Sequence, residues 1–88
     1  MTNIKLSCGF EAEVDEEAIN DVEMLEGLND LREGDVTAFI RILKLFGMEK
    51  EDRNNLYQAI KGENRRAPID KLMEQINEIF GQLNSKKK

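Results

Sequence analysis

The sequence predicts a mostly α-helical fold, in which an N-terminal β-hairpin precedes a compact bundle of about four helices around a central helix at 35–46. Three observations predict it: a strand-like alternation in the first fourteen residues, an almost wholly apolar segment between two glycines, and a long apolar stripe near the C-terminus. A chain of 88 residues buries only about 60 to 65 per cent of its unfolded surface, which is enough for one small domain. We expect this domain to span residues 1–83 and a flexible basic tail to follow at 84–88.

The N-terminal alternation indicates a hairpin whose register can be chosen from the sequence. A two-residue turn would pair Leu6 with Glu11 and place a charge on the apolar face. A three-residue loop pairs Leu6 with Phe10 instead, and puts Gly9 where a type I turn with a bulge needs positive φ. We therefore predict strands at about 2–6 and 10–14.

A first helix is predicted to begin at Asp15, whose side chain can cap it, with two glutamates in the opening turn where the helix dipole favours negative charge. Its inner stripe is predicted to be Ala18, Val22, Leu25 and Leu28. Three further apolar residues lie at the margin of its acidic face and are candidates for partner binding: Ile19, Met24 and Leu31.

The central helix at 35–46 lies within the segment GDVTAFIRILKLFG. Its polar residues Thr37, Arg41 and Lys44 share one narrow stripe, so the rest of its surface is apolar and should be surrounded by the other elements. Asp35 can cap its start and Gly47 can end it. About twelve residues are too few to span a bilayer, which needs roughly twenty.

Two more helices follow, a polar one at about 49–61 ended by Gly62 and a last one that starts at Pro68. The last helix carries a complete amphipathic stripe: Ile69, Leu72, Met73, Ile76, Ile79, Phe80 and Leu83. Part of this stripe must close the core. In the alternative, this helix undocks and offers its apolar face to another protein, through the candidate residues Leu72, Ile76, Ile79, Phe80 and Leu83.

The net charge of −5 hides a division along the chain. Residues 1–35 hold eleven acids against Lys5 and Arg32, whereas residues 36–88 have a net charge of +4. The acidic half argues against a nucleic-acid surface, which needs clustered lysine and arginine. It is either a solvated face or a docking face for a basic partner, including the basic half of a second copy in a homo-oligomer.

The residues needed for catalysis or metal binding are missing from the sequence. There is no histidine and a single cysteine, Cys8, so no zinc or haem ligand set and no internal disulfide can form. No phosphate-binding or calcium-binding loop occurs, and no carboxylate pair stands out from the acidic face. We expect a non-enzymatic protein without cofactors. We also expect a cytoplasmic location without membrane insertion, because the N-terminus has no basic leader with an apolar run.

Three segments together resemble a known family: KLSCGFEAEVDEEAINDVEMLEGLNDLREGD (5–35), FIRILKLFG (39–47) and NRRAPIDKLMEQINEIF (64–80). The best markers are Gly9-Phe10, Val14-Asp15, Asp21-x-Glu23-x-Leu25-Glu26, Gly34-Asp35 and Arg66-x-Pro68-Ile69. With these the chain resembles the small tail assembly chaperones of long-tailed (siphovirus-type) phages and prophages of Gram-positive bacteria. One departure is Val22, where such proteins often have a large aromatic residue.

This resemblance implies a protein that binds the aggregation-prone tape measure protein and assists tail tube assembly in an infected or lysogenic host. In many relatives a ribosomal frameshift near the end of the reading frame yields an extended form that engages the tail tube protein. The adjacent codons of Lys86, Lys87 and Lys88 are compatible with such a slippery site, although a solvated tail explains these residues as well.

A second hypothesis is a small acidic phage regulatory protein, an anti-repressor or DNA mimic, which would bind a basic host or phage protein through residues 15–35. Binding of that kind should weaken steeply with salt, whereas capture of an apolar helix should not.

Overall fold

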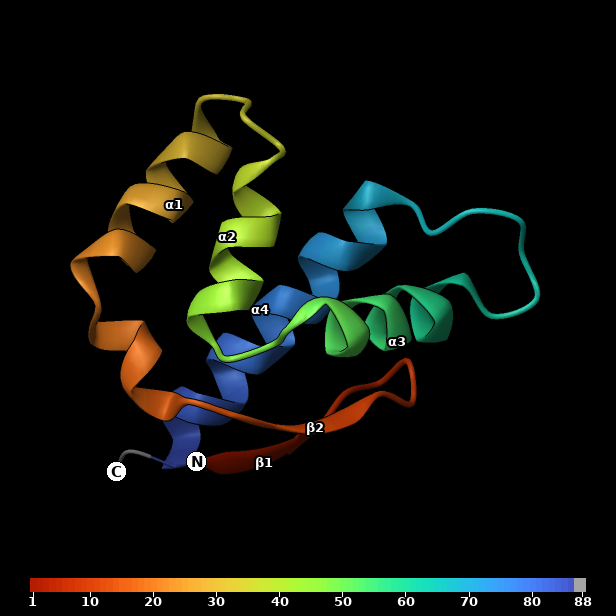
Figure 1. The fold of residues 1–88 in the computed structure, drawn as a ribbon, viewed down its shortest axis with the longest axis horizontal. Helices are drawn as coiled ribbons and strands as arrows, with labels where there is room; N and C mark the ends of the chain where they lie inside the picture. The colour runs from red at the N-terminus through yellow and green to blue at the C-terminus, as the bar shows by residue number, and fades with distance from the viewer. Residues whose placement is uncertain (87–88) are drawn as a thin grey trace.

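The computed structural model describes the backbone of residues 1–86 and the side chains of residues 1–84. In this part of the chain the elements are β1 (Thr2–Lys5), β2 (Glu11–Val14), the 3₁₀-helix η1 (Glu16–Asn20), α1 (Val22–Arg32), α2 (Ala38–Leu45), α3 (Lys50–Lys61) and α4 (Ile69–Lys86). Helix α2 lies between α1 and α3, and α4 runs behind α2 towards the hairpin (Figure 1). A mostly helical fold with an N-terminal hairpin and four α-helices confirms the predicted fold class.

The hairpin has the register predicted from the apolar alternation. Ile4 is paired with Ala12 and Lys5 with Glu11, and the Leu6 N–H donates to the Phe10 carbonyl over 2.8 Å. Gly9 has a φ of 99°, which a residue with a Cβ rarely adopts. The three-residue loop is therefore correct, and it keeps the apolar face of the hairpin continuous against the helices.

Helix α2 begins three residues later than predicted. The Asp35 carboxylate accepts a hydrogen bond from the Thr37 N–H at 3.1 Å, but this first turn is tight, because its backbone bonds join residues three apart rather than four. The prediction that α2 is surrounded is wrong on one side, where Val36 and Ile40 are 50% and 44% exposed. Gly47, with a φ of 92°, ends the helix as predicted.

All elements contribute to one hydrophobic core, whose buried residues are Ile4, Leu6, Phe10, Val14, Ala18, Met24, Phe39, Ile42, Leu43, Phe46, Met48, Leu56, Ile76, Ile79 and Leu83. Phe46 is fully buried, and its ring contacts that of Phe80 edge-on at 5.4 Å between centroids. The carbonyl of Phe46 also accepts a hydrogen bond from the Asp15 N–H at 2.8 Å. One residue thus connects α2, α4 and the end of the hairpin.

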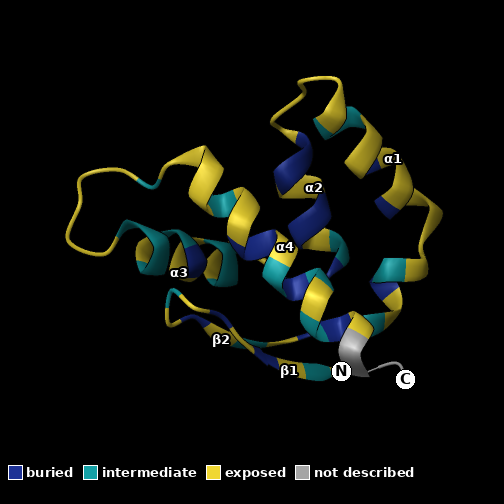
Figure 2. Ribbon diagram, turned by 180° about the vertical axis from the view of Figure 1, so that it is seen from behind, coloured by how far each residue is buried: buried dark blue, intermediate teal, exposed yellow. Residues whose placement is uncertain are grey.

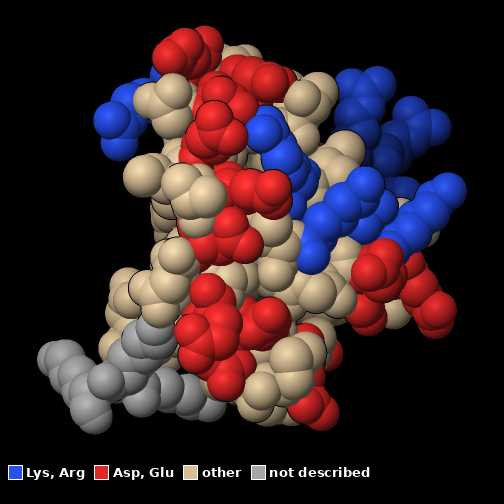
Figure 3. Space-filling view, turned by 60° about the vertical axis from the view of Figure 1, so that its left-hand side comes forward, with Lys and Arg blue, Asp and Glu red and all other residues tan. Residues whose placement is uncertain are grey.

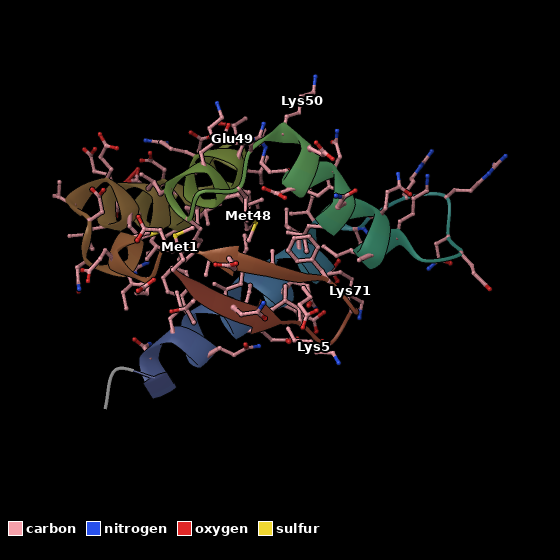
Figure 4. The ribbon with its side chains drawn as sticks, turned by 60° about the horizontal axis from the view of Figure 1, so that its bottom comes forward. Met1, Lys5, Met48, Glu49, Lys50 and Lys71 are labelled. Carbon is pink, nitrogen blue, oxygen red and sulfur yellow. The ribbon has the colours of Figure 1, made fainter. Side chains whose placement is uncertain are left out.

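Helices α3 and α4 each begin one residue later than predicted, at Lys50 and Ile69, and α3 ends at Lys61 as predicted. Met48 points into the interior before α3, whereas Glu49 and Lys50 point away from it (Figure 4). Gly62, with a φ of 57°, ends α3. Helix α4 continues to Lys86, so residues 84–86, which were predicted to begin a flexible tail, are helical, and the flexibility of this segment stays a prediction. The remainder of that predicted tail, Lys87 and Lys88, lies outside the described residues.

Polar contacts fasten the hairpin loop to α4. The Glu78 carboxylate accepts hydrogen bonds from the Ser7 hydroxyl and from the Ser7 N–H, the latter at 2.9 Å. Gln75 donates to the Ser7 hydroxyl at 3.2 Å, and Gln82 donates to the Lys5 carbonyl at 2.7 Å. These bonds join residues about seventy positions apart, so they close the fold between its first and last elements.

Two helical glycines provide a matched test of the packing. A Cβ at Gly27 would lie 3.0 Å from Cγ1 of the buried Ile42, whereas a Cβ at Gly81 would meet nothing within 4 Å. We expect Gly27→Ala to lower the free energy of unfolding, because overpacking costs about 1 to 3 kcal/mol and exceeds the helix-propensity gain of about 1 kcal/mol. Gly81→Ala should raise it by up to about 1 kcal/mol. Urea unfolding followed by circular dichroism measures both, and equal effects would contradict the close contact between α1 and α2.

The Ser7–Glu78 contact should make stability depend on acid pH. Hydrogen bonds from the Ser7 hydroxyl and N–H lower the pKa of Glu78 below its ordinary value of 4.5, so the folded state favours the charged form. This stability is present above pH 4.5 and is lost as the pH falls through the lower, folded-state pKa. The difference in unfolding free energy between the wild type and Glu78→Gln should therefore be larger at about pH 7 than at about pH 3. A difference that does not change with pH would show that the carboxylate charge has no part in this contact.

Candidate functional site

A break between η1 and α1 sets the rotation of α1 about its own axis, and so decides which of its residues face the core. Asp15 caps η1 by accepting a hydrogen bond from the Glu17 N–H at 3.0 Å, and Asp21 caps α1 by accepting from the Glu23 N–H at 2.8 Å. Asp21 itself has extended backbone angles, with φ −80° and ψ 135°. A 3₁₀ segment with three residues per turn, followed by one extended residue, rotates the next helix relative to a continuous α-helix.

Because of this break, the predicted inner stripe of the first helix is wrong beyond Ala18. Val22 and Leu25 are 71% and 68% exposed and Leu28 is 36% exposed, whereas Met24 is buried. The sequence does contain a signal for this phase: the second aspartate, Asp21, stands before an apolar run in the same way as the first and can start a helix of its own.

The structure places the predicted partner-binding residues in or against the core. Met24, Ile76, Ile79 and Leu83 are each at most 2% exposed, and the half-buried residues Ile19, Leu31, Leu72 and Phe80 pack against the same core. A partner could reach the buried four only if α1 or α4 left the core. The hypothesis that α4 undocks therefore stays a prediction, and in the folded state other apolar residues are open to a partner.

Two of the exposed apolar side chains, Leu28 and Met73, line a groove between α1, α2 and α4. It has a volume of about 290 Å³ and is lined by Leu28, Leu31, Arg32, Phe39, Met73, Ile76 and Asn77. Seen from behind, α1 and the first turns of α4 lie on opposite sides of α2, and both carry exposed residues, whereas the rest of α4 crosses in front of α2 (Figure 2). Leu25 lies one turn from Leu28 on α1, and Ile69 lies one turn from Met73 on α4, so exposed apolar residues extend beyond the lining. We call this groove and its borders the apolar groove.

On the face of the molecule that carries α1, acidic side chains form a band down the middle of the view (Figure 3). Most of the lysine and arginine side chains in this view lie to the right of that band. On α1 the helical spacing puts Leu25, Leu28 and Arg32 on one side of the buried stripe and Glu23 and Asp30 on the other. Asp30 pairs with Arg41 of α2 at 2.6 Å, and its hydrogen bond raises the pKa of that guanidinium above its ordinary value. The apolar side of α1 therefore faces the apolar groove, and its charged side faces away.

Among the residues that the structure describes, no group of three or more Cys, Asp or Glu side chains could hold a metal ion. Cys8 is a free, half-buried thiol in the hairpin turn. None of the described helices is both long enough and apolar enough to cross a membrane.

Comparison of the chain with models of protein families, with curated proteins and with solved structures finds no match.

Two neighbouring residues of α1, one buried and one exposed, test which side of this helix faces the core. Met24→Ala should lower the free energy of unfolding by about 2 to 5 kcal/mol, because it removes a fully buried side chain and leaves a cavity. Leu25→Ala should change it by no more than about 0.5 kcal/mol, because Leu25 is 68% exposed. Thermal or urea unfolding of the two variants measures both changes in the free energy of unfolding. The opposite ranking would restore the inner stripe predicted from the sequence.

Proposed function

We propose that this protein is a non-enzymatic tail assembly chaperone of a long-tailed phage or prophage. In this proposal it binds the tape measure protein and assists tail tube assembly in the cytoplasm of an infected or lysogenic bacterial host. The sequence resemblance supports the proposal, and several of its markers serve the fold: Gly9 occupies the hairpin turn at positive φ, and Asp15 and Asp21 cap η1 and α1.

The observation that carries the proposal is the open apolar groove in a fold that is otherwise well packed. Leu25, at the border of the groove, is 68% exposed, and Met73, in its lining, is 45% exposed. Contiguous exposed apolar surface on a small domain commonly marks a protein-binding site. A chaperone needs such surface in its folded state, together with charge that keeps the complex in solution.

The band of carboxylates on the α1 face favours a second candidate function. A small acidic regulatory protein, an anti-repressor or DNA mimic, would use this band to bind a basic protein. Its binding would depend on charge rather than on apolar contact, so the two candidate functions predict different responses to salt.

The first experiment is co-expression with the tape measure protein encoded at the same locus, followed by affinity purification of this chain. We expect the tape measure protein to become soluble, to copurify, and to remain bound when the salt rises from about 0.1 to about 0.5 M, because apolar contacts are not screened. Recovery in the soluble fraction with and without this chain is the measurement.

Two results would contradict the chaperone proposal. If the tape measure protein stays insoluble while this chain is folded, the proposed client is wrong. If binding is lost at moderate salt, charge rather than apolar contact holds the complex, which favours the acidic regulator. The further proposal that a frameshifted form engages the tail tube protein is tested by the gene sequence, and fails if no slippery run precedes an overlapping frame.

A further inference from the structure

We propose that the outer edge of β2 is a docking site for an extended segment of a partner protein, which adds to the hairpin as an antiparallel strand and carries basic residues at alternate positions. The site consists of the backbone groups of Glu11 and Glu13 together with their carboxylates. It shares no residue with the lining of the apolar groove, and the inference does not rest on the proposed function.

The hydrogen-bond pattern of the hairpin decides which backbone groups point outwards. In an antiparallel pair, every second residue exchanges hydrogen bonds with its partner, and the residues between them point their N–H and C=O groups away from the partner strand. The Leu6 N–H donates to the Phe10 carbonyl, so the residues bonded across this hairpin are the even-numbered ones. Glu11 and Glu13 therefore point their backbone groups towards the outer edge of β2.

The corresponding edge of β1 is closed by side chains of α4. The Lys5 N–H donates to Oε1 of Gln82 at 3.4 Å, and the Lys5 carbonyl accepts from Nε2 of the same amide at 2.7 Å. The Ser7 N–H donates to the Glu78 carboxylate at 2.9 Å. An amide and a carboxylate thus occupy the positions at which a further strand would pair with β1, so this edge is blocked while α4 is docked.

The edge of β2 has no such cover. Within the part of the chain that the structure describes, the N–H and C=O groups of Glu11 and Glu13 have no hydrogen-bond partner, and both residues are exposed. Buried backbone groups are paired in more than about 90% of cases, so these unpaired groups indicate an edge that is open to water. At Asp15 the edge is closed, because its N–H donates to the Phe46 carbonyl. Between that point and the hairpin loop, the edge can bond an added strand through both glutamates.

Charge selects the side chains of the added strand. Glu11 and Glu13 lie on one face of β2, opposite the face that packs on the core. Residues directly opposite each other in neighbouring strands share a face, and opposite charges at such positions are favourable. Strand β1 already places Lys5 opposite Glu11. A strand at the other edge can present lysine or arginine to the same two carboxylates, at positions two residues apart.

The same charges argue against a second copy of this chain as the occupant. If two β2 strands paired about a two-fold axis centred on Ala12, Glu11 of one copy would lie opposite Glu13 of the other. Like charges directly opposite each other destabilise a strand pair. Charged side chains on an exposed edge also commonly prevent self-association. The edge is therefore suited to a basic strand and not to its own copy.

Amide hydrogen exchange followed by NMR tests this geometry before any ligand is added. We expect the Glu11 and Glu13 amide hydrogens to exchange at least about tenfold faster than that of Ala12, which bonds to β1. Slow exchange at both glutamates in dilute protein would show that the edge is covered and would overturn the inference. Protection that appears only as the protein concentration rises would show that a second copy covers the edge, which also overturns it.

The probe for binding is a capped peptide of about seven residues in which valine and lysine alternate. We expect it to slow amide exchange at Glu11 and Glu13. In NMR titrations it should bind at least about tenfold more tightly than the same peptide with glutamate in place of lysine, because the glutamate peptide meets like charge.

Two N-methylated peptides separate strand addition from simple charge attraction. In the proposed register the lysines lie opposite the glutamates and point their N–H groups at the edge, whereas the valines point theirs away. N-methylation of the lysines should weaken binding at least about tenfold, and N-methylation of the valines should change it less than about threefold. Both peptides keep the charge of the parent, so equal binding of the two would contradict strand addition.

Two uncharged substitutions at one position localise the binding. Glu13→Gln keeps the outward N–H group, whereas Glu13→Pro removes it, and proline is accepted on edge strands whose N–H faces solvent. Glu13→Pro should bind the lysine peptide about tenfold more weakly than Glu13→Gln does, and circular dichroism checks that both are folded. If Glu13→Pro does not fold, the N-methylated peptides decide the question with the wild-type protein.

The inference fails if the lysine peptide is not bound, if the glutamate peptide binds equally well, or if folded Glu13→Pro binds as tightly as Glu13→Gln. None of these results bears on the tape measure protein, whose copurification is measured separately. Conversely, failure of the tape measure protein to copurify with the wild type would leave the binding of a basic strand at β2 unaffected.

Discussion

The burial of Phe46 is the contact on which the rest of this fold depends. Its ring packs edge-on against Phe80 of α4, and its carbonyl accepts the Asp15 N–H at the point where the hairpin passes into η1. An aromatic pair of this kind contributes about 0.5 to 1.5 kcal/mol beyond its buried area. More important here, one residue fixes the end of α2 relative to both ends of the chain, so a small domain closes around a helix of only eight residues.

Helix α4 has two roles that divide along its length and around its surface. Ile76, Ile79 and Leu83 complete the core, and Glu78 and Gln82 hold the hairpin through hydrogen bonds. The side that bears Met73 and Asn77 is left to form a wall of the apolar groove. The helix can therefore present apolar surface to a partner while it stays in the core, so binding need not be coupled to the cost of undocking it.

The same separation holds for α1, and it gives the protein two distinct surfaces. Leu25 and Leu28 face the groove side, and Glu23 and Asp30 occupy the opposite side, where Asp30 pairs with Arg41. An exposed ion pair adds little stability, so the Asp30–Arg41 pair contributes little to the fold. Apolar contact and long-range attraction of a basic partner are consequently available from one helix.

The sequence by itself determined the elements that depend on local rules: the hairpin register from the alternation around Gly9, the end of α2 at Gly47 and of α3 at Gly62, and the amphipathic α4. It failed where neighbouring elements decide the outcome. The phase of α1 depends on how η1 and the extended Asp21 fit between the hairpin and α2, and the exposure of Ile40 and Met73 depends on which sides of α2 and α4 their neighbours leave uncovered. Periodicity identifies the residues of an apolar stripe, but only tertiary packing decides which of them are covered, because a short helix has more apolar surface than its few neighbours can bury.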